Sequence, residues 1–194
     1  METWSDREYA DPVPYLRHRA EVIVSLGPRL EPGDRLVDLA CGDGGLADFL
    51  PDGVGYRGVD GSEAMVAEGR ARGRAVELGD LNDYEPPEPV AATTCFRAIY
   101  YTRDRAAFFR HVAGYTEKKL VFDLNPRQYR VDDVRADLTA AGFGLLELRP
   151  FFSPQRFSLP RLVTGGLHAL ERTPLAALLL RFRFSYVCAA SRRT

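Results

Sequence analysis

Short apolar runs alternate along the chain with segments whose apolar residues recur every three or four positions. The runs predict strands, because a strand that is buried on both faces is apolar throughout. They lie at 35–40, 55–60, 75–78, 89–96, 119–124, 144–151 and 181–190. The periodic segments predict helices at 15–30, 44–50, 62–72, 103–115, 131–141 and 159–180, the last one broken into two pieces by Gly165-Gly166 and Pro174.

The order of these elements predicts the fold class. Strands that alternate with helices at this spacing form βαβ units, and hence an α/β fold with a mainly parallel sheet. The 194 residues contain no internal repeat, low-complexity tract or linker. We therefore expect a single domain over 1–194, in which a polar arm and a helix over 1–34 precede the first strand.

The composition narrows the possible partners. Hydrophobic residues make up 45% of the chain and charged residues 27%, with a formal net charge of −1. This balance offers no general field for nucleic acid or an anionic membrane. The first residues, METWSDREYADP, lack the apolar core of a signal peptide, and the three cysteines are widely spaced. We expect a cytoplasmic protein, a monomer or homodimer, without a disulfide framework or a metal site, zinc included.

A glycine-rich stretch, LVDLACGDGG at 36–45, follows the first predicted strand. Gly42, Gly44 and Ala47 satisfy the pattern G-x-G-x-x-G/A, which lets the backbone approach a ligand at the start of a helix. Asp60 ends the next predicted strand, where a carboxylate can accept from both hydroxyls of a ribose. These features alone also fit an NAD site, a tight turn at the glycines, or a helix cap at Asp60.

Two further acids disfavour a dinucleotide. Asp38 lies inside the glycine motif, where a dinucleotide would put its anionic pyrophosphate, so it suits a ligand with a positive centre. Asp80 follows the third predicted strand, where it can accept from an adenine amino group while Leu81 packs on the ring. A ligand with a cationic amino acid end, a ribose and an adenine but no phosphate is S-adenosylmethionine.

Three segments resemble the successive nucleoside-binding motifs of class I S-adenosylmethionine-dependent methyltransferases: LVDLACGDGG, YRGVDGSEAMV and ELGDLND. The similarity extends from Tyr15 to about Asp123. It implies a Rossmann-like three-layer sandwich whose seven-stranded sheet has the order 3-2-1-4-5-7-6, with the last strand antiparallel. It also implies S-adenosyl-L-methionine as cofactor and S-adenosyl-L-homocysteine as product.

The resemblance implies roles for particular positions. The methionine end of the cofactor would lie against Asp38, Ala40, Gly42 and Gly44, and the ribose against Asp60. The remaining cofactor contacts would come from Gly61 and Met65 beside the sugar or adenine, Asp80 and Leu81 at the adenine, Phe96 and Arg97 on its other face, and Tyr9, Tyr15 and Arg19 over the carboxylate. Core packing is an alternative role for Phe96.

The acceptor is less well defined by the sequence. The fourth predicted strand lacks the NPPY-type segment of nucleic acid base methylases, so we expect a small molecule, methylated at oxygen or nitrogen. His168, in a region that often roofs the acceptor pocket in this family, and Tyr101 are the candidate catalytic residues, and 150–180 is the expected lid. An RNA or protein acceptor, or a nucleoside-binding protein without catalysis, remain the alternatives.

Overall fold

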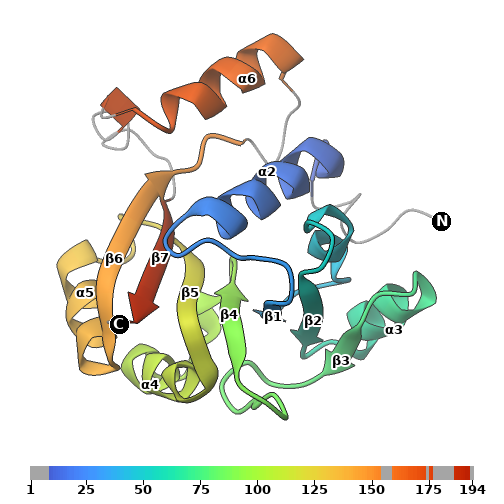
Figure 1. Cartoon of the computed structure of the whole chain (residues 1–194), viewed down its shortest axis with the longest axis vertical. Coiled ribbons are helices and arrows are strands. Elements are labelled where there is room, and N and C mark those ends of the chain that lie inside the picture. Colours follow the sequence, from blue (N-terminus) through green and yellow to red (C-terminus); the bar gives the residue numbers. More distant parts are fainter. Residues whose placement is uncertain (1–8, 154–158, 174, 177–185, 193–194) are drawn as a thin grey trace.

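The computed structural model describes residues 9–153, 159–173, 175–176 and 186–192. Its seven strands form one sheet in the order β3-β2-β1-β4-β5-β7-β6, in which only β7 runs against its neighbours (Figure 1). The strands are β1 (Arg35–Leu39), β2 (Gly55–Asp60), β3 (Val76–Leu78), β4 (Val90–Cys95), β5 (Thr116–Leu124), β6 (Phe143–Pro150) and β7 (Tyr186–Arg192). The predicted sheet order is confirmed.

Among the described residues, one α-helix precedes the first strand, and four further α-helices and two 3₁₀ helices lie between the strands. They are α2 (Pro12–Ser25), η1 (Gly45–Phe49), α3 (Glu63–Ala71), η2 (Ile99–Tyr101), α4 (Arg105–Tyr115), α5 (Val131–Ala140) and α6 (Arg161–Leu170). Among the described residues, no helix is both long enough and apolar enough to cross a membrane.

Three predicted helices differ from the observed ones. The first begins at Pro12, where proline suits the first turn, and ends at Ser25, because Gly27 turns the chain with φ +69°. The segment after the glycine motif forms a 3₁₀ helix and not an α-helix. Helix α6 runs through Gly165-Gly166, which lowers its stability but leaves it unbroken. The predicted parts at 177–180 and 181–185 lie outside the described residues.

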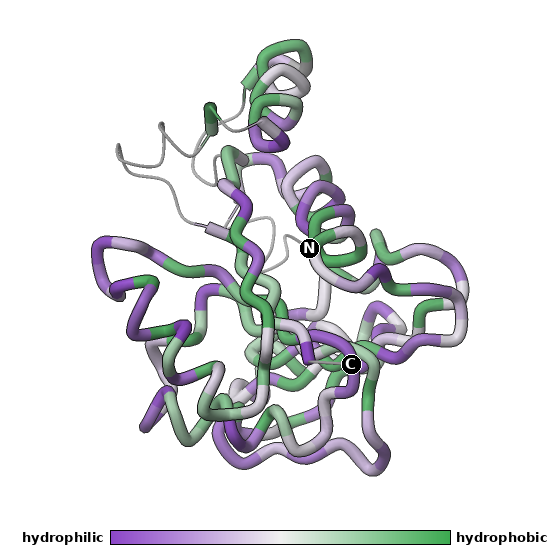
Figure 2. Tube along the Cα trace, turned by 60° about the vertical axis from the view of Figure 1, so that its left-hand side comes forward, coloured by the Kyte–Doolittle hydropathy of each residue, from purple (hydrophilic) through white to green (hydrophobic). Residues whose placement is uncertain are grey.

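The sheet buries both of its faces, as the continuous apolar runs require. Along β5, Leu120 and Phe122 face the cluster that contains Phe109 of α4 and Val134 of α5. Val121, which points the other way, joins the cluster formed by α2. Figure 2 shows the hydrophobic positions concentrated in the strands and on the inner sides of these helices. The result is a three-layer sandwich with the sheet in the middle.

A buried lysine fixes the C-terminal end of α2 against the sheet. The side chain of Lys119 in β5 has no exposed surface, and its Nζ donates to the carbonyl oxygens of Val24, at 3.2 Å, and Leu26, at 2.7 Å. These are carbonyls that the end of a helix leaves without a partner in the helix. Burial lowers the pKa of Lys119 from 10.5 to about 7.

This lysine makes a pH-dependent contribution to stability. The folded chain releases the proton near pH 7, whereas the unfolded chain keeps it until about the ordinary pKa of 10.5. Between these values the unfolded state binds more protons, so this contribution to the free energy of unfolding rises with pH, by at most about 1.4 kcal/mol per pH unit. We expect the difference in unfolding free energy between wild type and Lys119→Met to shift in favour of wild type from pH 7 to 9.5 in urea titrations. A difference that stays constant over this range would contradict the lowered pKa.

Candidate functional site

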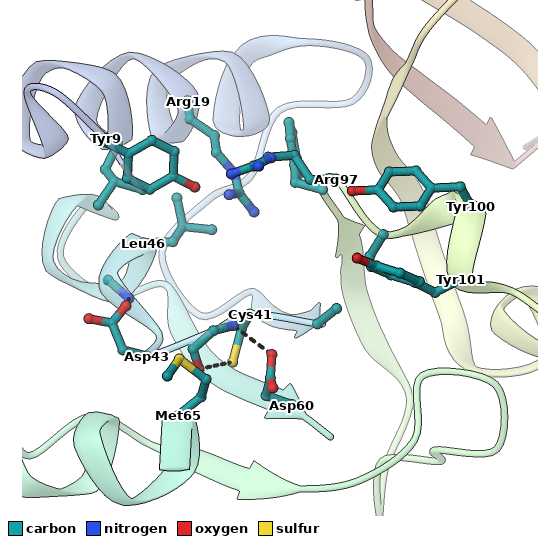
Figure 3. Close-up of a pocket in the computed structure, with 16 residues that line it drawn as sticks. Tyr9, Arg19, Cys41, Asp43, Leu46, Asp60, Met65, Arg97, Tyr100 and Tyr101 are labelled. Atoms are coloured by element: carbon teal, nitrogen blue, oxygen red, sulfur yellow. Dashed lines mark hydrogen bonds between the residues drawn. The ribbon is translucent and has the colours of Figure 1, made fainter. Parts of the chain in front are cut away.

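A cavity of about 350 Å³ opens at the carboxyl ends of β1, β2 and β4 (Figure 3). Strands β1 and β4 are neighbours here, and the strands that follow them in the chain, β2 and β5, lie on opposite sides of this pair. Open α/β sheets bind ligands at such a point of the strand order. Eight predicted site residues line the cavity: Arg19, Ala40, Gly42, Asp60, Met65, Phe96, Arg97 and Tyr101. Tyr9, considered for the N-terminal arm, also lines it.

The glycine motif forms a loop with several left-handed residues. Ala40, Gly42 and Gly44 have φ values of +54°, +63° and +70°. Gly42 lines the cavity, whereas Gly44 is required by packing, because a Cβ there would lie 2.7 Å from the side chain of Val76. The loop therefore exposes backbone to the cavity at one glycine and packs against β3 at the other.

Asp60 holds this loop from the end of β2. Its Oδ2 accepts from the backbone N–H of Gly42 at 2.8 Å, and its Oδ1 accepts from the N–H of Ser62 at 2.9 Å. A carboxylate offers about four lone-pair positions, so two remain for further donors from the cavity. Ser62, and not Asp60, provides the side-chain cap of α3 by accepting from Met65.

Asp38 lies behind the cavity wall. Its carboxylate is buried and accepts from Thr94 Oγ1 at 2.6 Å, from Tyr56 OH at 3.2 Å and from Arg19 Nη2 at 3.3 Å. The positive centre that this acid suits is thus a side chain of the protein, and Asp38 is not among the described residues that line the cavity. Burial alone would lower the pKa of Arg19, but Asp38 reverses this and the pKa is raised, so Arg19 stays charged.

Helix α2 and the preceding residues supply one wall of the cavity. Arg19 lies over the ring of Phe96, with 3.9 Å between the guanidinium carbon and the ring centroid, a cation–π contact. Tyr9 stacks on Tyr15 with centroids 4.4 Å apart. Tyr15 is buried outside the cavity lining, so it supports Tyr9.

The end of β4 supplies the opposite wall. Arg97 has φ +55°, and its backbone N–H donates to Asp123 Oδ1 at 2.6 Å, which holds this strained conformation. Two tyrosines follow on η2, Tyr100 and Tyr101, with 46% and 67% of their surface exposed. Figure 3 shows Arg97 and both phenol groups on the same side of the cavity.

The chain is similar in sequence to known proteins over part of its length. The sequence model of the family described as methionine biosynthesis protein MetW matches residues 19–85. A trans-aconitate 2-methyltransferase of Mycobacterium tuberculosis is 32% identical over 104 residues, which cover 50% of this chain and 40% of that relative. The match therefore spans less than half the length of the relative.

Solved structures match over much more of the chain. Magnesium protoporphyrin IX methyltransferase from Synechocystis PCC 6803, with bound S-adenosylmethionine, has a TM-score of 0.60 at 19% identity, over 84% of this chain and 71% of that one. An S-adenosylmethionine-dependent methyltransferase from Clostridium acetobutylicum has a TM-score of 0.64 at 13% identity, over 94% and 93%. The chain has the fold of these S-adenosylmethionine-dependent methyltransferases. The fold that the sequence resemblance implies is confirmed.

A second cavity of about 390 Å³ adjoins the first in this methyltransferase fold. It shares Ala40 and is also lined by the predicted residues Gly61, Asp80 and Leu81. The Oδ1 of Asp80 accepts from Asn82, and its Oδ2 accepts from Arg103 Nη2 at 2.6 Å. These bonds lower the pKa of Asp80, so it is ionised, but an adenine amino group would share the carboxylate with a guanidinium.

His168 lies elsewhere in the methyltransferase fold. It belongs to α6 and stacks on His18 of α2, with Ser153 Oγ 3.0 Å from its Nε2. It is not among the described residues that line either cavity. Burial and the neighbouring His18 lower its pKa. The sequence spacing could not show this, because nothing in it fixes where α6 lies relative to α2.

Several residues that line the first cavity were not predicted: Leu16, Cys41, Asp43, Gly45, Leu46 and Ala98. Asp43 stands between the two glycines of the motif, and this position was the signal that could have indicated it. Its carboxylate is buried and pairs with Arg74 at 3.0 Å. Burial raises the pKa of Cys41, so its thiol stays protonated.

The packing role of Gly44 can be measured against a matched glycine. Gly73 has a similar φ of +75°, but a Cβ there would have no neighbour within 4 Å. Both Gly→Ala variants carry the left-handed penalty of about 1–2 kcal/mol, and Gly44→Ala adds an overpacking cost of about 1–3 kcal/mol. We expect urea unfolding to show a larger loss of stability for Gly44→Ala. Equal losses of unfolding free energy in the two variants would contradict the packing role of Gly44.

Proposed function

We propose that the chain is an S-adenosylmethionine-dependent methyltransferase that methylates an oxygen or nitrogen of a small molecule. The observation that carries the proposal is the cavity at the carboxyl ends of β1, β2 and β4, with the glycine loop and Asp60 side by side in it. The domain would span 1–194, and segment 150–180 would form the lid over the acceptor.

The cofactor would be held by both walls of the cavity. Asp60 has lone pairs left for the ribose hydroxyls, and Gly42 lets the ligand approach the backbone. Because Arg19 lines the cavity and Asp38 lies behind its wall, we assign Arg19, and not Asp38, to the charged methionine end, where its cation meets the carboxylate. Met65 and Phe96 would pack beside the nucleoside, whose adenine would reach the adjoining cavity at Leu81.

The sulfonium of the cofactor supplies the activated methyl group, and the protein's part is to orient the acceptor for in-line attack. Burial raises the pKa of Tyr100, so its phenol is a donor and not a base at neutral pH. We assign Tyr101 the same positioning role, and we assign no catalytic base to His168, which lies outside the cavity. An acceptor that arrives as an anion needs no base.

These features favour a carboxylate among small-molecule acceptors. Arg97, Tyr100 and Tyr101 all line the wall of the first cavity at the end of β4. The guanidinium of Arg97 has the geometry to pair with a carboxylate. The relative that matches half of the chain is a trans-aconitate 2-methyltransferase, and aconitate is a carboxylate. Methylation at a carboxylate oxygen is therefore the reaction to test first.

The direct test is methyl transfer from radiolabelled S-adenosylmethionine to a panel of small carboxylic acids, phenols and amines, with RNA and protein fractions as competing acceptors. Transfer to a small molecule, reduced in Arg97→Ala, supports the proposal. Transfer only to RNA or protein would overturn the acceptor assignment. Cofactor binding with no transfer to any acceptor would favour a nucleoside-binding protein without catalysis.

The ribose assignment makes a quantitative prediction. Asp60→Ala removes charge-assisted hydrogen bonds and should weaken S-adenosylmethionine binding by about 1.5–3 kcal/mol in calorimetric titrations. Asp52, exposed in the turn before β2, provides the matched control, because Asp52→Ala removes an acid that does not line the cavity. Unchanged affinity in a folded Asp60→Ala protein would exclude the ribose role.

A further inference from the structure

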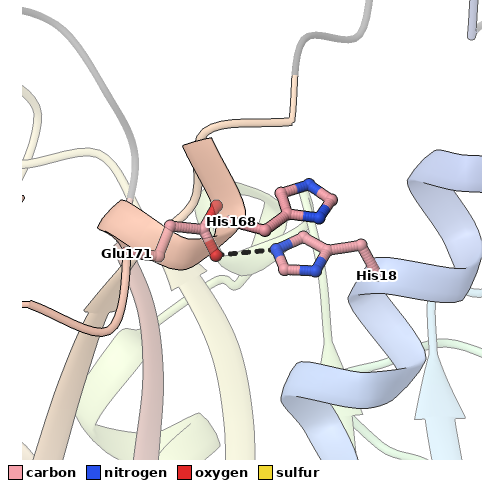
Figure 4. A group of neighbouring side chains, drawn as sticks. All are labelled: His18, His168 and Glu171. Atoms are coloured by element: carbon pink, nitrogen blue, oxygen red, sulfur yellow. Dashed lines mark hydrogen bonds and ion pairs between the residues drawn. The ribbon is translucent and has the colours of Figure 1, made fainter. Parts of the chain in front are cut away.

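Three potential metal ligands meet where α6 crosses α2. They are His18 on α2, His168 on α6 and Glu171 directly after α6, and one ligand atom from each lies within 4.8 Å of the others (Figure 4). The chain has only three histidines, and two of them are here. The group lies outside both cavities assigned to the cofactor and acceptor.

The three side chains lie close together, but their present geometry is not that of a metal-bound site. His18 Nε2 and Glu171 Oε2 are 2.7 Å apart, and the two imidazole rings are stacked with centroids 3.4 Å apart and planes 6° apart. Ligand atoms around a tetrahedral zinc ion are roughly 3.3 Å apart. Imidazole lone pairs lie in the plane of the ring, so one ring must turn for both to face one ion.

Burial separates this group from an ordinary surface cluster. His18 and Glu171 are each 4% exposed, and His168 is half-buried. The bond between His18 and Glu171 satisfies one atom of each residue, but it leaves the second buried imidazole nitrogen, Nδ1 of His18, without a hydrogen bond. That nitrogen lies 3.8 Å from Glu21 Oε2.

The surroundings resemble the outer shell of a metal site. A ligating histidine turns its other nitrogen toward a carboxylate, and a ligating carboxylate is itself hydrogen-bonded. Here Glu21 faces Nδ1 of His18, and the backbone N–H of Phe152 donates to Glu171 Oε1 at 2.6 Å. The hydroxyl of Ser153 lies 3.0 Å from Nε2 of His168. Glu171 and His168 thus each have a hydrogen-bonding neighbour, and a carboxylate lies near the open nitrogen of His18.

We propose that His18, His168 and Glu171 bind one divalent transition-metal ion of the zinc type, which fastens α6 to α2. The ion replaces the proton between His18 Nε2 and Glu171 Oε2, and this proton passes to solvent. The half-buried His168 ring turns out of the stack to direct a nitrogen at the ion, and water completes the tetrahedron. Two imidazoles and one carboxylate are a ligand set that zinc accepts.

This site goes beyond the proposed methyl transfer and does not take part in it. It also differs from the expectation of no metal site, which rested on the cysteines alone. Helix α6 leaves Leu162 93% exposed, so it has little apolar contact of its own on that side to hold it in place. A metal link to His18 would stabilise α2 as well, and α2 carries Leu16 and Arg19 of the first cavity.

The test is calorimetric titration of the chelator-treated, tag-free protein with Zn²⁺. We expect one ion per chain and an increased Tm on binding. His168→Phe keeps a ring stacked on His18 but removes the ligand, and it should weaken zinc binding by at least about 10-fold. His111→Phe is the matched control, because His111 lies on α4 with its Nε2 at the carbonyl of Tyr84, away from the site.

Cobalt spectra distinguish this site from adventitious binding at the three cysteines. Co²⁺ bound by the wild type should give visible bands of a nitrogen and oxygen site, without the near-ultraviolet band of a thiolate. His168→Cys should restore binding and add that band. Zinc binding that His168→Phe leaves unchanged, a thiolate band in the wild type, or no binding of either metal to the wild type would each overturn the proposal.

Discussion

A buried ion pair, Asp38 with Arg19, organises the candidate site. Asp38 belongs to β1, and its carboxylate also accepts from Thr94 of β4 and Tyr56 of β2, so one side chain connects three adjacent strands to α2. A buried charge without its partner costs about 3–5 kcal/mol, which strongly favours the position of α2 that brings the two together. This position gives the cavity its second wall, because Arg19 and Leu16 then face the glycine loop.

The two walls are held by different means. On the strand side, left-handed backbone at Ala40, Gly42 and Arg97 is fixed by carboxylates, with Asp60 bonded to the loop and Asp123 to Arg97. On the helix side, stacked rings and the Arg19–Phe96 contact form the surface. A rigid strand edge suits groups that need fixed geometry, such as a ribose.

Much of this fold could be predicted from the sequence because its signals are local. The apolar runs gave the strands within a few residues, and the glycine motif and Asp60 lie at strand ends, where the parallel sheet brings them together. The environment of Asp38 could not be predicted, since its three donors come from separate elements. The place of His168 depends on how α6 lies across α2, and no periodicity in the sequence specifies that.

The central claim is that the cavity binds S-adenosylmethionine, and calorimetric titration with S-adenosylmethionine, S-adenosylhomocysteine and NADH in parallel tests it most directly. The account predicts binding of the first two, with a Kd of about micromolar, and no binding of NADH, because the site is assigned to a nucleoside with an amino acid end and not to a pyrophosphate. Binding of NADH alone would contradict the assignment of the glycine loop and its acids.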